Sequence, residues 1–304
     1  MKNKKNIVLA LIAVIIYVVI FSLAQFGVLS RHTQSLLVPI GVNIILAVSL
    51  NLTVGFLGEL TLGHAGFMSV GAYAGCLFTI YCNLPVWIEF PLALIIGGLV
   101  AAIFGVIIGI PALRLNGDYL AIVTLAFGEI IRSVLNNVKF TGGAGGLKGI
   151  DKTSNFTIAY ILVILTLIVI TNVVRSRHGR AIMAIRDNII AAQSVGINIV
   201  YYKLVAFVGA AFFAGVAGVK PSTFDFNKSI EILVIVVLGG MGNITGSVIA
   251  AIIITLLPEV LRDLADYRML IYSIALIVMM LFSSNPTLVE FRKKIFKTKK
   301  GGNK

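Results

Sequence analysis

Residues 175–203 read RSRHGRAIMAIRDNIIAAQSVGINIVYYK and form a polar, basic interruption in a chain that is apolar over most of its length. Four apolar side chains in this stretch recur at helical spacing on one face, namely Ile182, Ile185, Ile189 and Ala192. Gly179 precedes the run and Gly196 follows it, at positions where helix boundaries are expected. The pattern predicts a short amphipathic helix in a segment that connects two apolar ones.

Two interpretations of this helix remain open. It is either a docking helix offered to another protein on the cytoplasmic side, or part of a solvated loop whose helix lies on the bilayer surface. The residues assigned to the candidate docking surface are Gly179, Arg180, Ile182, Ile185, Arg186, Asp187, Ile189, Ala191, Ala192 and Gly196.

The composition excludes a water-facing surface. Of the 304 residues, 59% are hydrophobic and 12% are charged, whereas a soluble domain carries roughly 25% charged residues. The net charge of +13 does not indicate nucleic-acid binding, because no basic stripe is interleaved with aromatic residues. Cys76 and Cys82 fit no metal-ligand spacing and are interpreted as packing residues. The chain is therefore expected to be an all-α polytopic membrane protein.

The apolar runs predict about nine transmembrane helices, some of them short or broken. The first extends from about residue 7 to 26, and the last from about 269 to 282. The long run 230–257 is interrupted by LGGMGNITG at 238–246, and its glycines argue against one unbroken helix.

Charge distribution sets the expected orientation. If residues 230–257 form two short spans, the basic tail 284–304 lies on the same side as the segment 175–203. Both then satisfy the rule that lysine and arginine concentrate in the cytoplasm. The sequence thus predicts cytoplasmic N- and C-termini and a single transmembrane domain over residues 1–304, with 175–203 and 284–304 as its cytoplasmic segments.

A second glycine-rich stretch, GFLGELTLGHAGFMSVGAYAG at 55–75, carries the ionisable residues Glu59 and His64 near membrane depth. Such groups are costly in lipid and usually face a cavity or a partner, although Glu59 is equally compatible with a short cytoplasmic turn. Broken helices line cavities in transporters. The candidate pathway residues are Gly58, Glu59, Gly63, His64, Gly66, Gly239, Gly240 and Gly242. The alternative is that these glycines only permit tight helix packing.

No catalytic constellation or metal-ligand spacing is present in the sequence. The three histidines are scattered over different segments. Glu129 and Arg132 can pair across one helical turn. TGGAGGLKGI at 141–150 lacks the Gly-Lys followed by Ser or Thr that a phosphate loop requires. An enzyme is therefore disfavoured, and the chain is expected to hold no nucleotide of its own.

Five segments together make a specific resemblance. They are NLTVGFLGELTLGHAGFMSVGAYAG (51–75), RLNGDYLAIVTLAFGEIIRSV (114–134), TGGAGGLKGI (141–150), HGRAIMAIRDNIIAAQSVGINIVYYKLVAFVGAAFFAGVAG (178–218) and SIEILVIVVLGGMGNITGSVIAAIIITLLPEVLR (229–262). In these segments the chain resembles LivM-type permeases, the membrane subunits of branched-chain amino acid ABC importers.

The resemblance implies a multi-pass subunit of the bacterial cytoplasmic (inner) membrane. It implies a second related permease subunit, two cytoplasmic ATPase subunits that bind ATP and Mg, and an extracytoplasmic substrate-binding protein. It also implies that the docking loop has an Ala-Ala-xxx-Gly core, here Ala191, Ala192 and Gly196. Ile189 and Ile190 stand where an acidic residue is usual, which leaves apolar packing as the expected mode of docking.

The resemblance implies import of branched-chain, aliphatic amino acids driven by partner ATPases. Two alternatives remain open from the sequence. One is an ABC permease of the same fold for urea, an amide or a sugar, and the other is a self-sufficient secondary transporter.

Overall fold

The computed structural model describes residues 31–82, 85–115, 117–143, 147, 156–218 and 226–260, with a few isolated positions in 15–22 and 273–277. The elements defined there are all helical: α2 (Arg31–Asn51), η1 (Leu52–Leu57), α3 (His64–Tyr81), α4 (Val86–Ala112), α5 (Asp118–Asn137), η2 (Lys139–Thr141), α6 (Phe156–Arg175), α7 (Arg177–Asp187), α8 (Ile189–Ser194), α9 (Ile199–Ala217), α10 (Phe226–Gly239) and α11 (Ile244–Val260). The predicted all-α class is confirmed.

Some predictions fall largely or wholly outside the described residues. These are the first and last spans, much of the loop 141–150 and the basic tail 284–304.

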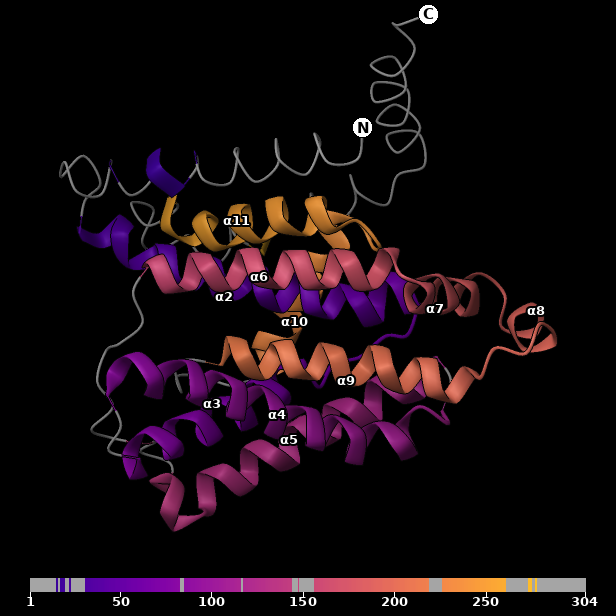
Figure 1. Ribbon diagram of the computed structural model, residues 1–304, viewed down its shortest axis with the longest axis horizontal. Helices are drawn as coiled ribbons and strands as arrows, with labels where there is room; N and C mark the ends of the chain where they lie inside the picture. The colour runs from indigo at the N-terminus through magenta and orange to yellow at the C-terminus, as the bar shows by residue number, and fades with distance from the viewer. Residues whose placement is uncertain are drawn as a thin grey trace, which may run out of the picture.

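The helices form two packed layers joined by α10 (Figure 1). One layer contains α2, α6 and α11, and the other contains α3, α4, α5 and α9. The π-helix η1 continues α2 and contacts both α7 and α9. At one end of the bundle α7 and α8 project beyond the layers (Figure 1), and this arrangement brings the polar segment 175–203 onto the helix breaks.

Four described helical stretches are long and apolar enough to cross a membrane. They are Thr33–Leu57, Trp87–Ala112, Phe156–Arg175 and Ile199–Ala217. The described stretch Ile244–Glu259 is apolar but shorter. The molecule is thus a polytopic membrane protein, while the number of about nine spans and the side on which the termini lie stay predictions.

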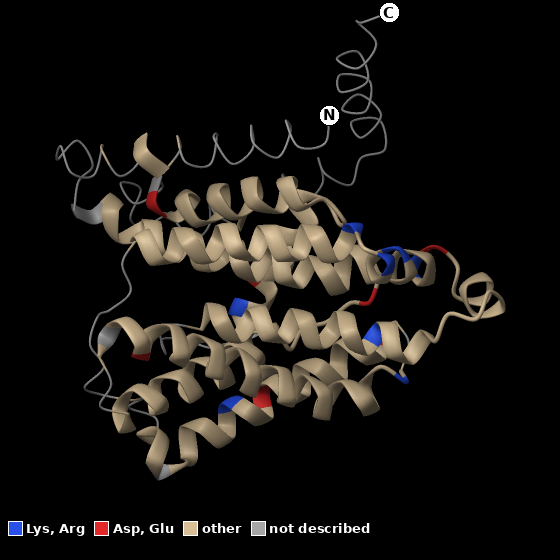
Figure 2. Ribbon diagram, in the orientation of Figure 1, with Lys and Arg blue, Asp and Glu red and all other residues tan. Residues whose placement is uncertain are grey.

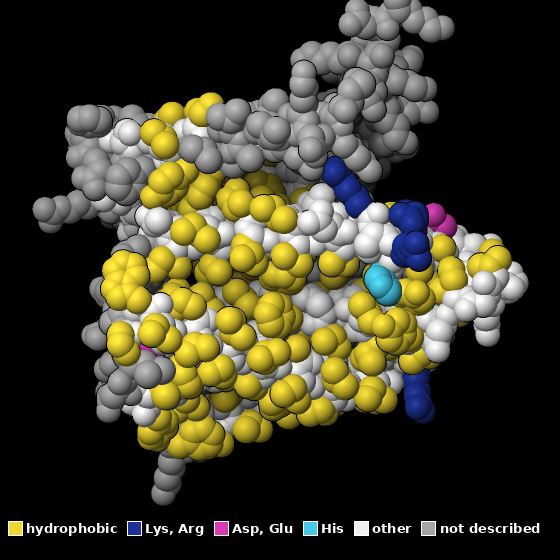
Figure 3. Space-filling model, in the orientation of Figure 1, with side chains coloured by type: hydrophobic (Ala, Val, Ile, Leu, Met, Phe, Trp, Pro, Cys, Tyr) yellow, Lys and Arg dark blue, Asp and Glu magenta, His cyan; other side chains and the backbone are white. Residues whose placement is uncertain are grey.

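Helix α4 shows how the bundle meets lipid. Its outward side chains are large and apolar, with Leu99, Ile103 and Ile107 more than half exposed. Its inward face carries small residues such as Ala101 and Gly105. Figure 3 shows the resulting apolar surface along the bundle, and most of the lysine and arginine side chains visible on this face lie near α7. In the ribbon α7 carries several blue residues close together, whereas single blue residues lie on helices such as α5 and α9 (Figure 2). This distribution suits a lipid-facing belt with a polar end.

The predicted interruption of the run 230–257 is confirmed. Helix α10 ends at Gly239, α11 begins at Ile244, and Gly240 and Gly242 adopt φ values of 89° and 79°. Left-handed backbone of this kind strongly favours glycine. A second interruption separates η1 from α3 at residues 58–63, within the glycine-rich stretch identified from the sequence.

Small residues allow α3, α4 and α9 to approach closely. A Cβ atom at Gly97 of α4 would lie 2.6 Å from the carbonyl oxygen of Gly71 on α3, and one at Gly215 of α9 would lie 2.7 Å from the carbonyl oxygen of Gly97. Neither backbone has room for a methyl group, so van der Waals contact between main chains holds these three helices together.

We therefore expect Gly97→Ala to destabilise the protein by about 1–3 kcal/mol, because the new methyl group overpacks a backbone contact. Thermal unfolding in detergent measures the effect. Gly209→Ala is the matched control, since its Cβ would lie 3.5 Å from Leu52 Cδ2, an ordinary contact. Equal melting temperatures for the two variants would contradict this packing.

Candidate functional site

The segment predicted as one amphipathic helix is two helices. Ser176 caps α7 by accepting a hydrogen bond from Gly179 N at 3.3 Å. Asn188 then leaves the helical conformation, with φ −159° and ψ 108°. Its side-chain oxygen accepts bonds from Ile190 N and Ala191 N at 3.1 and 3.0 Å, which begins α8. The prediction of a single continuous helix was wrong at this residue.

The break divides the predicted apolar face. Ile182, Ile185 and Ala192 are buried within the chain itself, whereas Ile189 is 41% exposed. The buried three pack with Leu52, Phe56 and Leu57 of η1 and Ala206 of α9. The isoleucine face is therefore not a single free surface. Its residues on α7 pack against the bundle, whereas Ile189 on α8 is exposed.

The remaining residues assigned to this surface lie around those helices. Gly179 is buried against the end of α6, while Arg180 is exposed and donates to Arg175 O at 3.2 Å. Ala191 is exposed, and Gly196, with φ 83°, turns the chain after α8. Lys203 does not belong to the loop as predicted, because it is 3% exposed inside α9.

Arg186 ties α7 to the first helix break. Its Nη1 donates to Gly55 O at 3.0 Å, and its Nη2 lies 2.9 Å from Asp187 Oδ1. Gly58 lies directly beneath the side chain, since a Cβ there would be 2.7 Å from Arg186 Cγ. The sequence did not reveal this contact, because the two partners are 131 positions apart.

Asn51 joins the two helix breaks to each other. It is fully buried, its Nδ2 donates to Ser247 Oγ at 3.0 Å, and its Oδ1 accepts from Gly242 N at 2.8 Å. A Cβ at Gly55 would collide with both Asn51 and the Gly242 backbone. The predicted pathway residues Gly58 and Gly242 therefore both lie beside Arg186, and Gly242 packs against Gly55, which was not among the predicted residues.

The other glycines of the candidate pathway serve close helix contacts. A Cβ at Gly63 would lie 2.5 Å from Thr124 O, one at Gly66 would lie 2.9 Å from Gly128 Cα, and one at Gly239 would lie 2.5 Å from Ser247 N. This geometry favours the packing interpretation for these three positions. The assignment of a translocation pathway to them stays a prediction.

Both ionisable residues of the first break have partners inside the bundle. Glu59 forms an ion pair with Lys203 of α9, and their side chains are 14% and 3% exposed. His64 is buried and its Nε2 lies 2.8 Å from Ser49 Oγ of α2. The break is thus tied to α9 by charge and to α2 by a neutral hydrogen bond.

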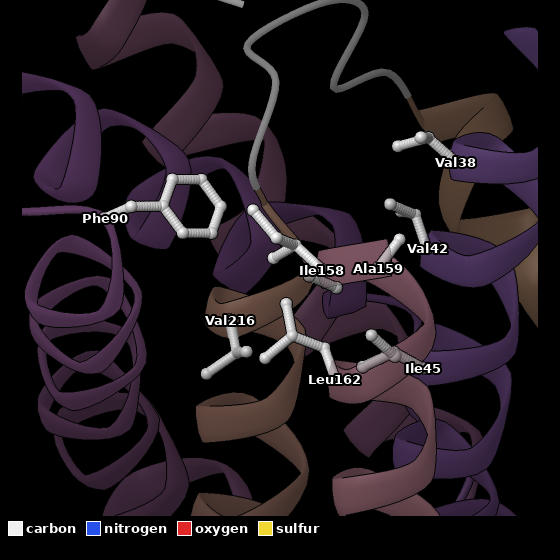
Figure 4. A pocket seen from close by; sticks show the side chains of 9 residues that line it. Val38, Val42, Ile45, Phe90, Ile158, Ala159, Leu162 and Val216 are labelled. Carbon is white, nitrogen blue, oxygen red and sulfur yellow. The ribbon is translucent and has the colours of Figure 1, made fainter. Parts of the chain in front are cut away.

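A small cavity lies at the other end of the bundle (Figure 4). Its volume is about 20 Å³, and it is lined by Val38, Val42, Ile45, Phe90, Ile158, Ala159, Leu162, Val216 and Ala217. The α6 residues belong to the first turns of that helix, far from the end that leads into α7. Since no polar side chain lines the cavity, it offers nothing to a charged ligand.

The described residues contain no group of three or more His, Cys, Asp or Glu side chains that could hold a metal ion. Glu129 and Arg132 pair at 3.1 Å on α5, as their spacing predicted.

Replacing Glu59 with Gln should destabilise the protein by about 3–5 kcal/mol, because it leaves the buried ammonium group of Lys203 unpaired. A double variant, Glu59→Gln with Lys203→Met, removes both charges and should recover most of the loss. Thermal unfolding in detergent provides the comparison. A single variant as stable as the wild type would show that the pair is not buried as described.

Comparisons with known proteins identify the family of this chain. The family described as "Branched-chain amino acid transport system / permease component" matches residues 32–283. The chain is 36% identical to the high-affinity branched-chain amino acid transport system permease protein LivM of Escherichia coli, over 95% of this chain and 77% of that protein. It is 38% identical to LivM of Salmonella typhimurium, over 83% of this chain and 69% of that one.

A more distant relative is the ribose import permease protein RbsC of Haemophilus influenzae, at 26% identity over 90% of this chain and 91% of the relative. No solved structure matches the chain significantly. The family match covers most of the chain, and the two LivM proteins are similar along more than two thirds of their own length. The chain therefore belongs to the family of permease components of branched-chain amino acid transport systems.

Proposed function

We propose that this protein is the membrane-embedded permease subunit of an ATP-driven importer that moves branched-chain amino acids across the bacterial cytoplasmic membrane. The observation that carries the proposal is membership of the permease family over residues 32–283, joined to similarity to two LivM proteins. The ribose permease is the weaker match, at 26% identity, so an aliphatic amino acid is favoured over a sugar.

The importer is a complex in this proposal. A second related permease subunit completes the membrane pathway, and an extracytoplasmic binding protein delivers the amino acid. Two cytoplasmic ATPase subunits bind ATP and Mg, which this chain does not hold. It contributes no catalytic residue, and its part is to convert movement of the ATPases into opening and closing of the pathway.

Helix α8 is the surface best suited to receive an ATPase subunit. Ile190 and Val195 are 76% and 74% exposed, and Ile189 is 41% exposed. Ile189 and Ile190 belong to α8 and Val195 directly follows it, and α8 lies beyond the packed layers (Figure 1). A small group of exposed apolar side chains surrounded by polar residues resembles the apolar centre and polar rim of a protein–protein interface.

Helix α7 supplies the mechanical link. Its inner face is packed against η1 and α9, and Arg186 holds the carbonyl of Gly55. Because Gly55 lies against Gly242, which is bonded to Asn51, a displacement of α8 reaches both helix breaks through α7. In this mechanism ATP-driven closure of the ATPases tilts α7 and changes the angle between helices on either side of each break.

The proposal is tested by reconstituting the chain with its partner permease, ATPase and binding-protein subunits in vesicles. ATP inside should drive uptake of leucine, isoleucine and valine, and ribose serves as the control solute. ATP-dependent uptake of ribose in place of the amino acids, or leucine uptake by this chain without any ATPase, would overturn the proposal.

Two sets of variants separate docking from transmission. Ile190→Asp with Val195→Asp should weaken co-purification of the ATPases by roughly tenfold or more, since buried apolar anchors are replaced by charge. Leu115→Asp, in the turn between α4 and α5, is the control, because Leu115 is 37% exposed. Retained binding by the α8 variant would place docking elsewhere.

Arg186→Glu should retain ATPase binding but lose uptake. The ATPases remain bound because α8 is untouched, but uptake is lost because the contact with Gly55 O is removed and a carboxylate faces that carbonyl. Membrane insertion, ATPase co-purification and leucine uptake are measured on the same preparation. Normal uptake by this variant would contradict the role of Arg186 in transmission.

A further inference from the structure

A second polar cluster connects α2, α10 and α11, away from the contacts of Arg186 of α7 with the helix breaks. Lys228 Nζ donates to Asn43 Oδ1 at 2.9 Å and lies 3.1 Å from Glu231 Oε2. Asn43 is 4% exposed, and its Nδ2 donates to Thr255 Oγ1 at 2.8 Å. Both ends of the buried amide are therefore occupied, which fixes the position of the Lys228 ammonium group.

The charged side chains of this cluster lie at membrane depth and are partly exposed. Asn43 belongs to the middle of the candidate span Thr33–Leu57. The side chains of Lys228 and Glu231 are 22% and 31% exposed, so each keeps room for a further hydrogen-bond partner. Ionisable side chains at such depth are costly, and their usual reason is a substrate or ion path.

The surface around the pair suits an aliphatic ligand. Along α10, Ile232, Ile235 and Val236 are buried against the rest of the chain, whereas Val234, one turn after Glu231 on the same side of the helix, is only partly buried. The neighbouring Ser229 is buried and its hydroxyl accepts a hydrogen bond from Ala65 N at 3.1 Å. That bond connects the cluster to the start of α3, directly after the helix break at 58–63.

We propose that Lys228 and Glu231 form a binding point for the backbone of the transported amino acid within the pathway. Lys228, positioned by Asn43, takes the α-carboxylate, Glu231 takes the α-ammonium group, and the side chain lies on the apolar surface at Val234. The inference rests on the proposed function and deepens it. Opposite charges one helical turn apart match a zwitterion, which has both charges on adjacent groups.

The first experiment uses the complete reconstituted importer with saturating, leucine-loaded binding protein. Lys228→Gln, Glu231→Gln and the double variant should each lower ATP-driven leucine uptake by roughly tenfold or more, because each loses a charge-assisted hydrogen bond to the substrate. ATPase activity should stay within about twofold of the wild-type value, because docking of the ATPase subunits is unaffected. Glu129→Gln with Arg132→Met is the matched control, since that pair has the same spacing and the same 3.1 Å distance on α5.

The double variant distinguishes substrate binding by Lys228 and Glu231 from a purely structural role of this ion pair. If the pair only stabilised the fold, removing both charges together would leave no unpaired charge, and the amide introduced by Lys228→Gln could still donate to Asn43 Oδ1. Uptake would then recover to within about twofold of wild type. Such recovery overturns the inference while the proposed function stands. Failure of the wild-type complex to import leucine would remove the proposed function, and the inference with it.

A second measurement leaves both charges in place. Val234→Cys is made with Cys76 and Cys82 replaced by serine, and reaction with a methanethiosulfonate reagent is followed during turnover. Leucine should slow the modification severalfold and ribose should not. Ile249→Cys on α11, where the native side chain is 57% exposed, is the control that leucine should not protect. Absence of leucine protection at position 234 while uptake proceeds would contradict the inference.

A phosphatidylethanolamine headgroup carries a similar pair of charges. The protection experiment is therefore repeated in vesicles of phosphatidylglycerol alone. Leucine protection in both lipids supports the amino acid as occupant. Protection that requires phosphatidylethanolamine and is indifferent to leucine would assign the pair to a lipid headgroup and overturn the inference.

Discussion

The fold depends on one buried contact between two interrupted helices. Within a membrane, backbone groups freed by a helix break must find partners inside the protein. Asn51 does this for Gly242 N and extends the contact to Ser247 through the other end of its amide. The arrangement is possible only because Gly55 has no side chain, so the Gly242 backbone can lie directly against it.

Around this contact the chain separates surfaces of different character. Large apolar side chains such as Ile103 face lipid, and small residues such as Gly97 face neighbouring helices. The charged groups that remain inside are paired, as in Glu59 with Lys203. Helix α7 rests on the same contact through Arg186, so the polar end of the molecule and the broken helices form a continuous structure.

Hydrophobic patterning predicted much of this fold, because burial in lipid imposes length and polarity on each helix. The apolar run around residues 87–110 forms α4, and the glycines at 238–246 separate α10 from α11. The break at Asn188 was not predicted, since asparagine is tolerated inside helices and only its capping bonds to α8 reveal the interruption. Periodicity also showed that Ile182 and Ile185 share a face, but not that this face packs against η1.

Long-range pairs account for the remaining differences. Lys203 was predicted to end the polar segment 175–203, yet Glu59, 144 positions away, allows it to be buried in α9. The contacts of Arg186 with Gly55 and of Lys228 with Asn43 likewise join distant segments. A single sequence records the charge of each partner but not their proximity, and it therefore placed the helices more reliably than the sites between them.

The central claim is that α7, α8 and the helix breaks move as one unit when ATP binds. The most direct test places spin labels in the reconstituted importer at Val195 and Met241, which are 74% and 62% exposed, and separately at Val195 and Tyr81, which is 77% exposed at the far end of α3. Pulsed electron paramagnetic resonance measures both distances with and without ATP. The account predicts an unchanged Val195–Met241 distance and an altered Val195–Tyr81 distance, whereas a Val195–Met241 distance that changes as much as the other would contradict it.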